Sequence, residues 1–263
     1  MNRVKDLFKS TKENGRAALS MYVTAGYPNL DASYSIIKSA IDAGVDIVEL
    51  GVPYSDPLAD GTTIQYASTA ALSNGVTLQD CIDLAVLLRA ASPNTPIVLM
   101  GYYNPFLQYG IENLSKECGL AGIDGLIVPD LPPEESGVLQ DALNLHGLDL
   151  IYLLAPTSDA ARVEQVIRRT TSFIYCVSVT GVTGARSTIE ADGLELVSQV
   201  KEATEFPVAL GFGISTPAHV REASGVADAV IVGSAFVDKI NNDLEGDLPK
   251  VIATYVDELR KAL

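Results

Sequence analysis

The hydrophobic residues of this chain gather in short runs, and the segments between the runs place apolar residues with helical spacing. Eight runs rich in Val, Ile and Leu lack the two-residue alternation of a half-exposed strand. Such continuous runs are typical of strands buried on both faces of a parallel sheet. The intervening segments, among them 31–44 and 78–91, predict amphipathic helices. The predicted strands are 18–23, 46–51, 96–101, 125–130, 149–155, 173–178, 207–213 and 228–234.

A weak internal repeat joins the helices to the strands. In "AGVDIVEL", "AGIDGLIV", "HGLDLIYL" and "SGVADAVIV" a glycine suited to the left-handed end of a helix precedes an aspartate and then a strand. Eight strand–helix units predict an α/β fold, a closed (β/α)8 barrel, with an open doubly wound sheet as the alternative. No linker divides the chain, so we expect residues 1–263 to form one domain with an extra N-terminal helix. Functional residues of a barrel lie at the C-terminal ends of its strands.

Composition and charge narrow the class of protein. With 48% hydrophobic and 19% charged residues the chain is expected to fold as a globular protein. Its net charge of -15 disfavours nucleic acid and anionic membranes as partners, because binding to either needs clustered Lys and Arg. The three cysteines form no CxxC motif, which disfavours a disulfide framework or a zinc site. Residues 1–16 are charged and no run reaches the ~20 apolar residues of a membrane span, so we expect a cytoplasmic protein.

The segment 48–65, "VELGVPYSDPLADGTTIQ", carries the strongest candidate chemistry. Three interpretations compete: a solvated turn, a metal site, or acid–base catalysis on a small molecule. Glu49 ends a strand that should be buried, and burial of a carboxylate raises its pKa toward the range that suits proton transfer. The alternative is a structural carboxylate that caps neighbouring amides. The predicted strand end favours catalysis.

Two aspartates follow in the same loop. Asp60 is a second catalytic carboxylate, a turn aspartate, or the N-cap of the helix beginning near Thr62. Asp56 is expected on the outer part of the loop, where it would contact a partner. A metal site is disfavoured because the two histidines, His146 and His219, are not predicted to lie at strand ends.

Three glycine clusters follow the last three predicted strands, at 180–186, 211–216 and 232–236. Glycine lets a ligand approach the backbone, and amides at a helix N-terminus bind anions. In barrels, phosphate is commonly held after strands seven and eight with a short extra helix, for which 234–240 is the candidate. The alternative is that these glycines only form tight turns. Arg186 is either a residue that closes over the site or a solvated charge.

Several reaction classes are disfavoured because the residue types that they need are missing from the predicted strand ends. No lysine ends a predicted strand, which disfavours Schiff-base aldolase chemistry. The scarcity of histidine disfavours a metal-dependent aldolase. The first strand lacks the carboxylate that a paired-aspartate sugar-phosphate isomerase would place there. The remaining reaction class is one in which carboxylates alone act on a phosphorylated substrate.

Several motifs resemble those of the tryptophan synthase alpha subunit family. They are "ELGVPYSDPLADGTTIQ" at 49–65, "MGYYNPFLQYG" at 100–110, "VPDLPPEES" at 128–136, "SVTGVTGAR" at 178–186 and "GFGIS" at 211–215. The resemblance covers nearly the whole chain. It implies a (β/α)8 barrel that cleaves indole-3-glycerol phosphate into indole and glyceraldehyde 3-phosphate. It also implies an α2β2 complex with a beta subunit that carries pyridoxal phosphate (PLP), so that the chain itself needs no cofactor.

The resemblance also implies roles for individual residues. Glu49 would transfer the proton and Asp60 would hydrogen-bond the indole N–H. The remaining implied residues fall into the indole and glycerol pocket (Tyr22, Met100, Tyr102, Tyr175), the phosphate site (Gly184, Gly213, Gly233, Ser234, with Gly211 and Phe212 beside them), the loop that positions Asp60 (Thr183), and the partner interface (Pro53, Asp56, Pro57, Asn104, Pro105).

Two positions depart from the family pattern. Thr62 replaces a proline after "ADG", and Tyr22 replaces a phenylalanine at the end of the first strand. Both changes are expected to affect loop order and basal rate without removing a catalytic group. Two further functions stay open: a protein that chiefly binds and activates a beta subunit, and a stand-alone lyase that releases indole.

Overall fold

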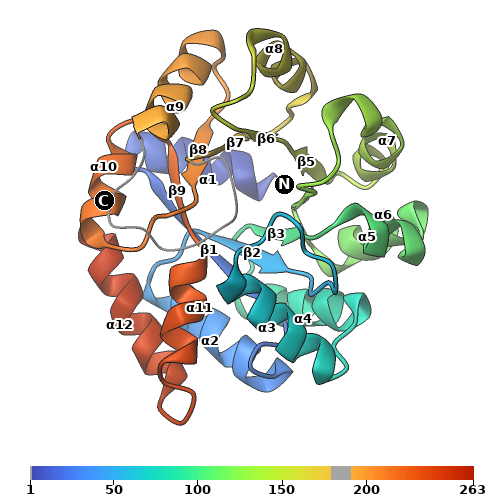
Figure 1. Cartoon of the computed structure of the whole chain (residues 1–263), viewed down its shortest axis with the longest axis vertical. Coiled ribbons are helices and arrows are strands. Elements are labelled where there is room, and N and C mark those ends of the chain that lie inside the picture. Colours follow the sequence, from blue (N-terminus) through green and yellow to red (C-terminus); the bar gives the residue numbers. More distant parts are fainter. Residues whose placement is uncertain (1, 179–190) are drawn as a thin grey trace.

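The strands curl into a barrel with the helices outside it (Figure 1). The structure, a computed structural model, describes residues 2–178 and 191–263. The described strands all pair in parallel, in the order β5-β4-β3-β2-β1-β9-β8-β7-β6. β5 and β6 stand at opposite ends of that order, yet only Tyr152 separates them in sequence. They are two parts of one barrel strand, which closes the sheet into the predicted barrel of eight strands.

Each predicted strand overlaps an observed one, because strands buried on both faces have continuous apolar sequences. The strands are β1 (Ala18–Thr24), β2 (Ile47–Gly51), β3 (Ile97–Met100), β4 (Gly125–Ile127), β5 (Asp149–Ile151), β6 (Leu153–Leu154), β7 (Ile174–Val177), β8 (Val208–Gly211) and β9 (Ala229–Val232).

The helices within the described residues connect the strands and cover the outside of the barrel. They are α1 (Arg3–Glu13), α2 (Leu30–Ala43), α3 (Thr62–Ser73), α4 (Leu78–Ala91), α5 (Tyr103–Tyr109), α6 (Ile111–Ala121), α7 (Gly137–Leu145), α8 (Ala160–Arg169), α9 (Ala191–Ala203), α10 (Pro217–Ser224), α11 (Ser234–Asn241) and α12 (Leu248–Arg260), with a 3-10 turn at Pro133–Glu135.

The strand alternation divides the buried apolar residues into two cores. The larger core lies between the outer face of the sheet and the helices and includes Leu19, Leu50 and Leu99. The smaller core fills the barrel interior, where Ile47, Val98, Ile127, Ile151 and Ile231 meet. Successive side chains of a strand point to opposite faces, so each strand supplies both cores.

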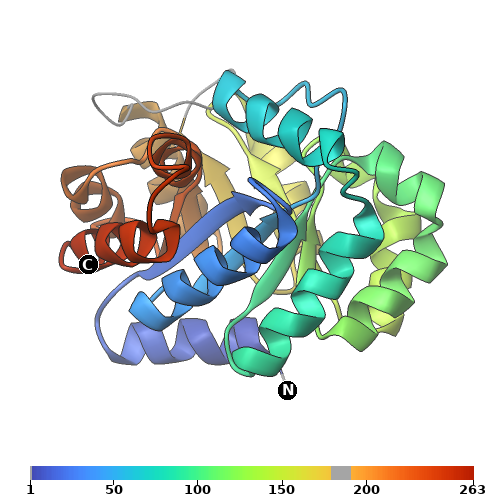
Figure 2. The same cartoon turned by 90° about the horizontal axis from the view of Figure 1, so that it is seen from below.

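The predicted N-terminal helix is present and closes one end of the barrel. In Figure 2, α1 lies across the lower end of the barrel. Its Val4 and Phe8 belong to the interior core, and the ring centroid of Phe8 lies 5.5 Å from that of Phe173. Arg3 is paired with Asp124 at 2.9 Å, which fixes the start of the helix.

Three of the four aspartates of the internal repeat tether neighbouring strands at the same end of the barrel. Asp46 accepts the backbone N–H of Leu19, Asp124 that of Ile97, and Asp228 that of Val208, each at 2.9 Å. A hydrogen bond to a charged acceptor is stronger than one between neutral groups. The repeat seen in the sequence is therefore a structural device that sets strand register.

Candidate active site

Glu49 lies inside the barrel and is completely buried. Its Oε1 accepts a hydrogen bond of 2.7 Å from Ser20 Oγ, while its Oε2 has no hydrogen-bond partner among the described residues. Burial raises the pKa of Glu49 to about 7, and the Ser20 hydrogen bond opposes that rise. A carboxyl with such a pKa can give or take a proton near neutral pH.

The predicted strand 46–51 ends where β2 ends, but the expectation that Glu49 stands at that end is wrong by two residues. β2 continues to Gly51, and Glu49 is its third residue. It pairs in register with Tyr22 of β1 and Val98 of β3. The carboxyl therefore sits within the barrel, below the rim formed by the loops.

Asp60 lies in the loop between β2 and α3, with 8% of its surface exposed. The hydroxyl of Tyr102 accepts the backbone N–H of Ala59 at 2.9 Å and also acts on the Asp60 carboxylate. Burial raises the pKa of Asp60 to about 6, and the interaction with Tyr102 opposes the rise. The alternative that Asp60 caps the following helix is wrong, because Gly61 is the N-cap residue of α3.

Tyr22 and Tyr175 stand beside the carboxylates from two different strands. Tyr175 is buried and Tyr22 is partly buried. Desolvation raises the pKa of each hydroxyl well above its ordinary value. Glycines make room for them. A Cβ atom at Gly51 would lie 2.3 Å from the Tyr22 hydroxyl, and one at Gly211 would lie 2.3 Å from the Tyr175 hydroxyl. Gly211 therefore has a packing role that the sequence did not indicate.

Two adjoining cavities open above these residues, with volumes of about 470 and 40 Å³. Asp60, Met100 and Phe212 line both, so the two spaces form one cleft. Glu49 lines neither of them, whereas Tyr22, its register partner on β1, and Tyr175 line the smaller one. Asp60 is therefore at the wall of the cleft, and Glu49 lies below its floor.

The predicted phosphate residues border the same cleft. Gly213, Gly233 and Ser234 line its smaller part. Gly233 is the N-cap of α11, which confirms a short helix after the last strand. Phe212 and Gly213 both have left-handed backbone, with φ of 73° and 76°. Three other predicted residues, Thr183, Gly184 and Arg186, lie outside the described residues.

The predicted partner residues lie on the loop after β2 and in the first turn of α5, at this end of the barrel. Asp56 and Asn104 are exposed, while Pro57 and Pro105 are half-buried. Asn104 Nδ2 donates to the hydroxyl of Tyr54 at 3.2 Å, which joins the loop to α5. Pro53, the fifth predicted partner residue, is buried, so it supports the loop from beneath and cannot itself contact a partner. Thr62 is the exposed first residue of α3.

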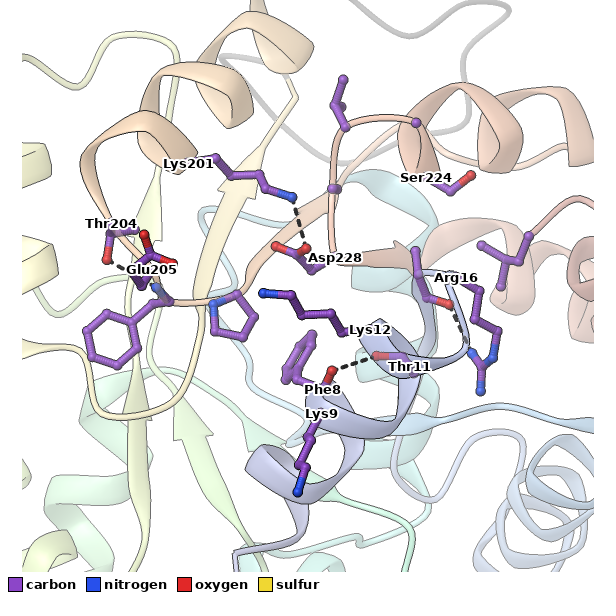
Figure 3. Close-up of a pocket in the computed structure, with 18 of the residues that line it drawn as sticks. Phe8, Lys9, Thr11, Lys12, Arg16, Lys201, Thr204, Glu205, Ser224 and Asp228 are labelled. Carbon is purple, nitrogen blue, oxygen red and sulfur yellow. Dashed lines mark hydrogen bonds and ion pairs between the residues drawn. The ribbon is translucent and has the colours of Figure 1, made fainter.

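A larger cavity of about 840 Å³ lies at the opposite end of the barrel, beside α1 (Figure 3). Figure 3 shows Lys12 and Lys201 approaching Asp228 from α1 and α9, and Lys201 pairs with Asp228 at 2.9 Å. Lys12, Lys201 and Arg221 of this cavity lie in the last turns of α1, α9 and α10, where a positive charge offsets the helix dipole. Neither catalytic candidate lines this cavity. Size alone would therefore have pointed to the wrong end of the barrel.

Metal and membrane features can be assessed for residues 2–178 and 191–263. Among these, no group of three or more His, Cys, Asp or Glu residues is arranged to hold a metal ion. Cys81, Cys118 and Cys176 are buried and free. Within the same residues no single helix is long and apolar enough to cross a membrane. α3 and α4 pass that test only together, and they are bent by 99° at the break between them.

Comparisons with known proteins assign the family. The family described as "Tryptophan synthase alpha chain" matches residues 8–262. The tryptophan synthase alpha chain of Geobacter sulfurreducens is 46% identical over 263 residues, which cover 100% of this chain and 99% of that protein. The chain belongs to the tryptophan synthase alpha chain family. The alpha chain of Chloroflexus aggregans is 44% identical over 262 residues, covering 100% of this chain and 98% of that protein.

Solved structures agree with the family assignment. A tryptophan synthase structure from Mycobacterium tuberculosis aligns with a TM-score of 0.92 and 38% identity, covering 99% of this chain and 98% of that chain. The tryptophan synthase alpha subunit from Legionella pneumophila gives a TM-score of 0.93 and 32% identity, covering 100% and 98%. The predicted resemblance, the (β/α)8 fold and the lyase function of a tryptophan synthase alpha chain are confirmed.

Sequence reasoning missed one residue of this alpha chain's site, Ser20. Ser20 lies in the predicted strand 18–23, "ALSMYV", and its sequence context predicts no functional role for it. The only signal was a hydroxyl in an apolar run, two residues before Tyr22 on the same strand face.

Proposed function

We propose that this chain cleaves indole-3-glycerol phosphate to indole and glyceraldehyde 3-phosphate, with Glu49 transferring the proton and Asp60 stabilising the charge that develops on the ring. One observation carries the assignment: a buried carboxyl with a raised pKa, Asp60, lines a cleft that reaches the first turn of α11, and a second such carboxyl, Glu49, lies below the floor of that cleft. Acid–base groups and an anion site thus face a single small molecule.

The proton balance of this reaction needs only one acid. Glu49 gives a proton to C3 of the indole ring, and the ring nitrogen then carries the positive charge. The bond between ring C3 and the glycerol side chain breaks, and its electron pair returns to the ring. The side-chain hydroxyl becomes the aldehyde as its proton returns to the Glu49 carboxylate. The catalyst ends in the state in which it began, so the chain needs no cofactor of its own.

Asp60 suits the charge that appears in the middle of this sequence. Its carboxylate lies at the wall of the cleft and would accept the ring N–H. Because Asp60 is largely buried, its attraction for a positive ring is less screened than it would be in water. The bond from the Ala59 N–H to the Tyr102 hydroxyl would hold the loop that carries Asp60 before the substrate arrives.

The phosphate of the substrate would be bound at the other end of the cleft. The first backbone amides of α11, at Ser234, and the glycines Gly213 and Gly233 support this assignment. A helix N-terminus attracts an anion through unpaired N–H groups and the helix dipole. This also answers how a chain of net charge -15 would hold a phosphate without a basic cluster in the cleft. We include Thr183 and Gly184 in the proposed site from the sequence alone.

The partner of this chain would be a tryptophan synthase beta subunit, in an α2β2 complex, with PLP held by the beta subunit. The loop that carries Asp56 and the first turn of α5, which carries Asn104, would form the contact. Leu58, on that loop, is 88% exposed, and such an exposed leucine favours a protein contact at this position. The ring of Tyr54 lies 5.3 Å from that of Tyr102, so the contact would reach the residue that holds the loop of Asp60. A cytoplasmic location belongs to the same proposal.

The test is indole release from indole-3-glycerol phosphate by the purified chain, alone and with a tryptophan synthase beta subunit. Slow release alone and acceleration on mixing are expected. Fast release that ignores the beta subunit would identify a stand-alone lyase. Release in neither condition would refute the proposed reaction, and Glu49→Gln should reduce release by at least ~10³-fold, since it removes the only proposed acid.

A second function, which can coexist with catalysis, is binding and activation of a beta subunit. The exposed Leu58 in the loop after β2 favours it. Glu49→Gln should abolish indole release while leaving that activation in place, which would separate the two functions.

A further inference from the structure

Ser20 places a hydroxyl in the barrel interior, where its neighbours are apolar. It pairs in register with Ile47 of β2 and Ile231 of β9, and both belong to the interior core. Ser20 itself is completely buried. A buried hydroxyl without a partner is costly, so its position must be explained by the bond that it makes.

The hydroxyl has one proton and two oxygen atoms within reach. Glu49 Oε1 lies at 2.7 Å, whereas the carbonyl oxygen of Ile47 lies at 3.5 Å. The shorter distance is that of a good hydrogen bond, and the longer one is at the limit. Ser20 therefore donates to Glu49. The other carboxyl oxygen, Oε2, is buried with no hydrogen-bond partner among the described residues.

We propose that Ser20 is a positioning residue for Glu49: its hydroxyl holds Oε1 below the floor of the cleft and leaves Oε2 as the oxygen that carries the transferable proton. This inference rests on the proposed proton-transfer role of Glu49. Ser20 would touch no substrate atom, because Glu49 lies between it and the cleft.

The bond selects an oxygen because a hydroxyl donor discriminates between the two forms of a carboxyl. An oxygen that already accepts the Ser20 proton is a poor site for a second proton, so protonation occurs at Oε2. The donor also favours the ionised form and so keeps the Glu49 pKa lower than burial alone would. The titratable groups that lie near Glu49 in the described site are Tyr22 of β1 and Tyr175 of β7; both Glu49 and Asp60 raise the pKa of these two hydroxyls.

The experiment compares the pH dependence of kcat/KM for wild type, Ser20→Ala, Ser20→Thr and Ser115→Ala. Ser115 is the matched control: it is equally buried and bonds a backbone carbonyl in α6 at 2.8 Å. Ser20→Ala should move the alkaline limb to higher pH. The ratio of kcat/KM at pH 8.5 to that at pH 6.5 should rise about threefold to tenfold, the factor for half to one pKa unit. Ser20→Thr keeps the hydroxyl and should restore the wild-type ratio.

Ser20→Cys provides the second variant should Ser20→Ala fold poorly, because a thiol is a weaker donor of similar shape. It should give an intermediate ratio. An unchanged ratio in both Ser20→Ala and Ser20→Cys would overturn the proposal, and so would an equal shift in Ser115→Ala.

A substrate-free titration separates this inference from the proposed reaction. The ¹³C signal of the Glu49 carboxyl, assigned by its loss in Glu49→Gln, should titrate at higher pH in Ser20→Ala than in wild type. Should the chain release no indole, the reaction would fail while the titration still tested the bond. An unchanged titration in an active enzyme would refute the role of Ser20 alone.

Discussion

The hydroxyl of Tyr102 accepts the backbone N–H of Ala59, the residue before Asp60, at 2.9 Å. The same tyrosine opposes the rise in the Asp60 pKa that burial causes. The loop between β2 and α3 is thereby tied to the residue that follows β3 by two positions. A tyrosine at the start of α5 thus anchors the loop that carries the Asp60 carboxylate.

Tyr102→Phe should weaken catalysis through Asp60. Loss of the hydroxyl removes the interaction that opposes the effect of burial, so the pKa of Asp60 should rise above about 6. It also removes the bond to the Ala59 N–H. The acidic limb of the kcat/KM profile should then move to higher pH, and the maximum should fall about tenfold, the effect of one lost interaction with a charged group. Tyr109→Phe is the control, since its hydroxyl bonds Gln79 outside the site at 2.6 Å. Identical profiles for Tyr102→Phe and wild type would contradict the proposed positioning of Asp60.

The wild-type enzyme should show a bell-shaped pH dependence of kcat/KM. Glu49 must be protonated, and its pKa of about 7 means that this form is lost as the pH rises through that value. Asp60 must be ionised, and its pKa of about 6 means that this form is lost as the pH falls through that value. The maximum should therefore lie between about 6 and about 7. The two limbs describe the coupled pair. A rate that rises steadily to pH 9 would show that Glu49 acts from its ionised form.

The barrel was predictable because its strands have a direct sequence signal. A strand buried on both faces is continuously apolar, and each run from 18–23 to 228–234 overlaps a strand of the structure. The interruption at Tyr152 was not predictable, because the run 149–155 stays apolar through it. Local sequence reports burial, but not the hydrogen-bond geometry that divides one barrel strand in two.

The sequence predicted which residues form the site better than it predicted how deeply each of them is buried. Glu49 and Asp60 were selected as acidic residues near a buried strand, and the structure brings both to one cleft region. That Glu49 lies below the floor depends on the stagger of β1 against β2, which pairs it with Tyr22. That Pro53 is buried depends on how its loop folds over the barrel. Both are tertiary relationships without a local pattern.

Gly51 should be intolerant of alanine because of the tyrosine that stands above it. The new Cβ would meet the Tyr22 hydroxyl at 2.3 Å and its ring carbons at 2.6 and 2.8 Å, so the ring must move. Overpacking of this kind costs about 1–3 kcal/mol of stability. Displacement of Tyr22 should also raise KM for indole-3-glycerol phosphate. Urea denaturation and steady-state kinetics measure the two effects. Gly137→Ala is the control, since a Cβ there meets nothing within 4 Å, and equal behaviour of the two variants would refute the clash.

Phe8→Ala should destabilise the barrel without changing its chemistry. Phe8 is buried at the end of the barrel opposite the cleft and packs on Phe173 with a centroid distance of 5.5 Å. Removal of a buried aromatic ring costs about 3–5 kcal/mol, through lost contacts and the cavity left behind. Urea denaturation should show this loss, while kcat per folded molecule stays within about twofold of wild type, since neither carboxyl touches the helix. Leu145→Ala is the control: this leucine is 83% exposed, and its removal should change stability by less than about 0.5 kcal/mol. A Phe8→Ala protein as stable as Leu145→Ala would mean that α1 only rests on the barrel and does not close it.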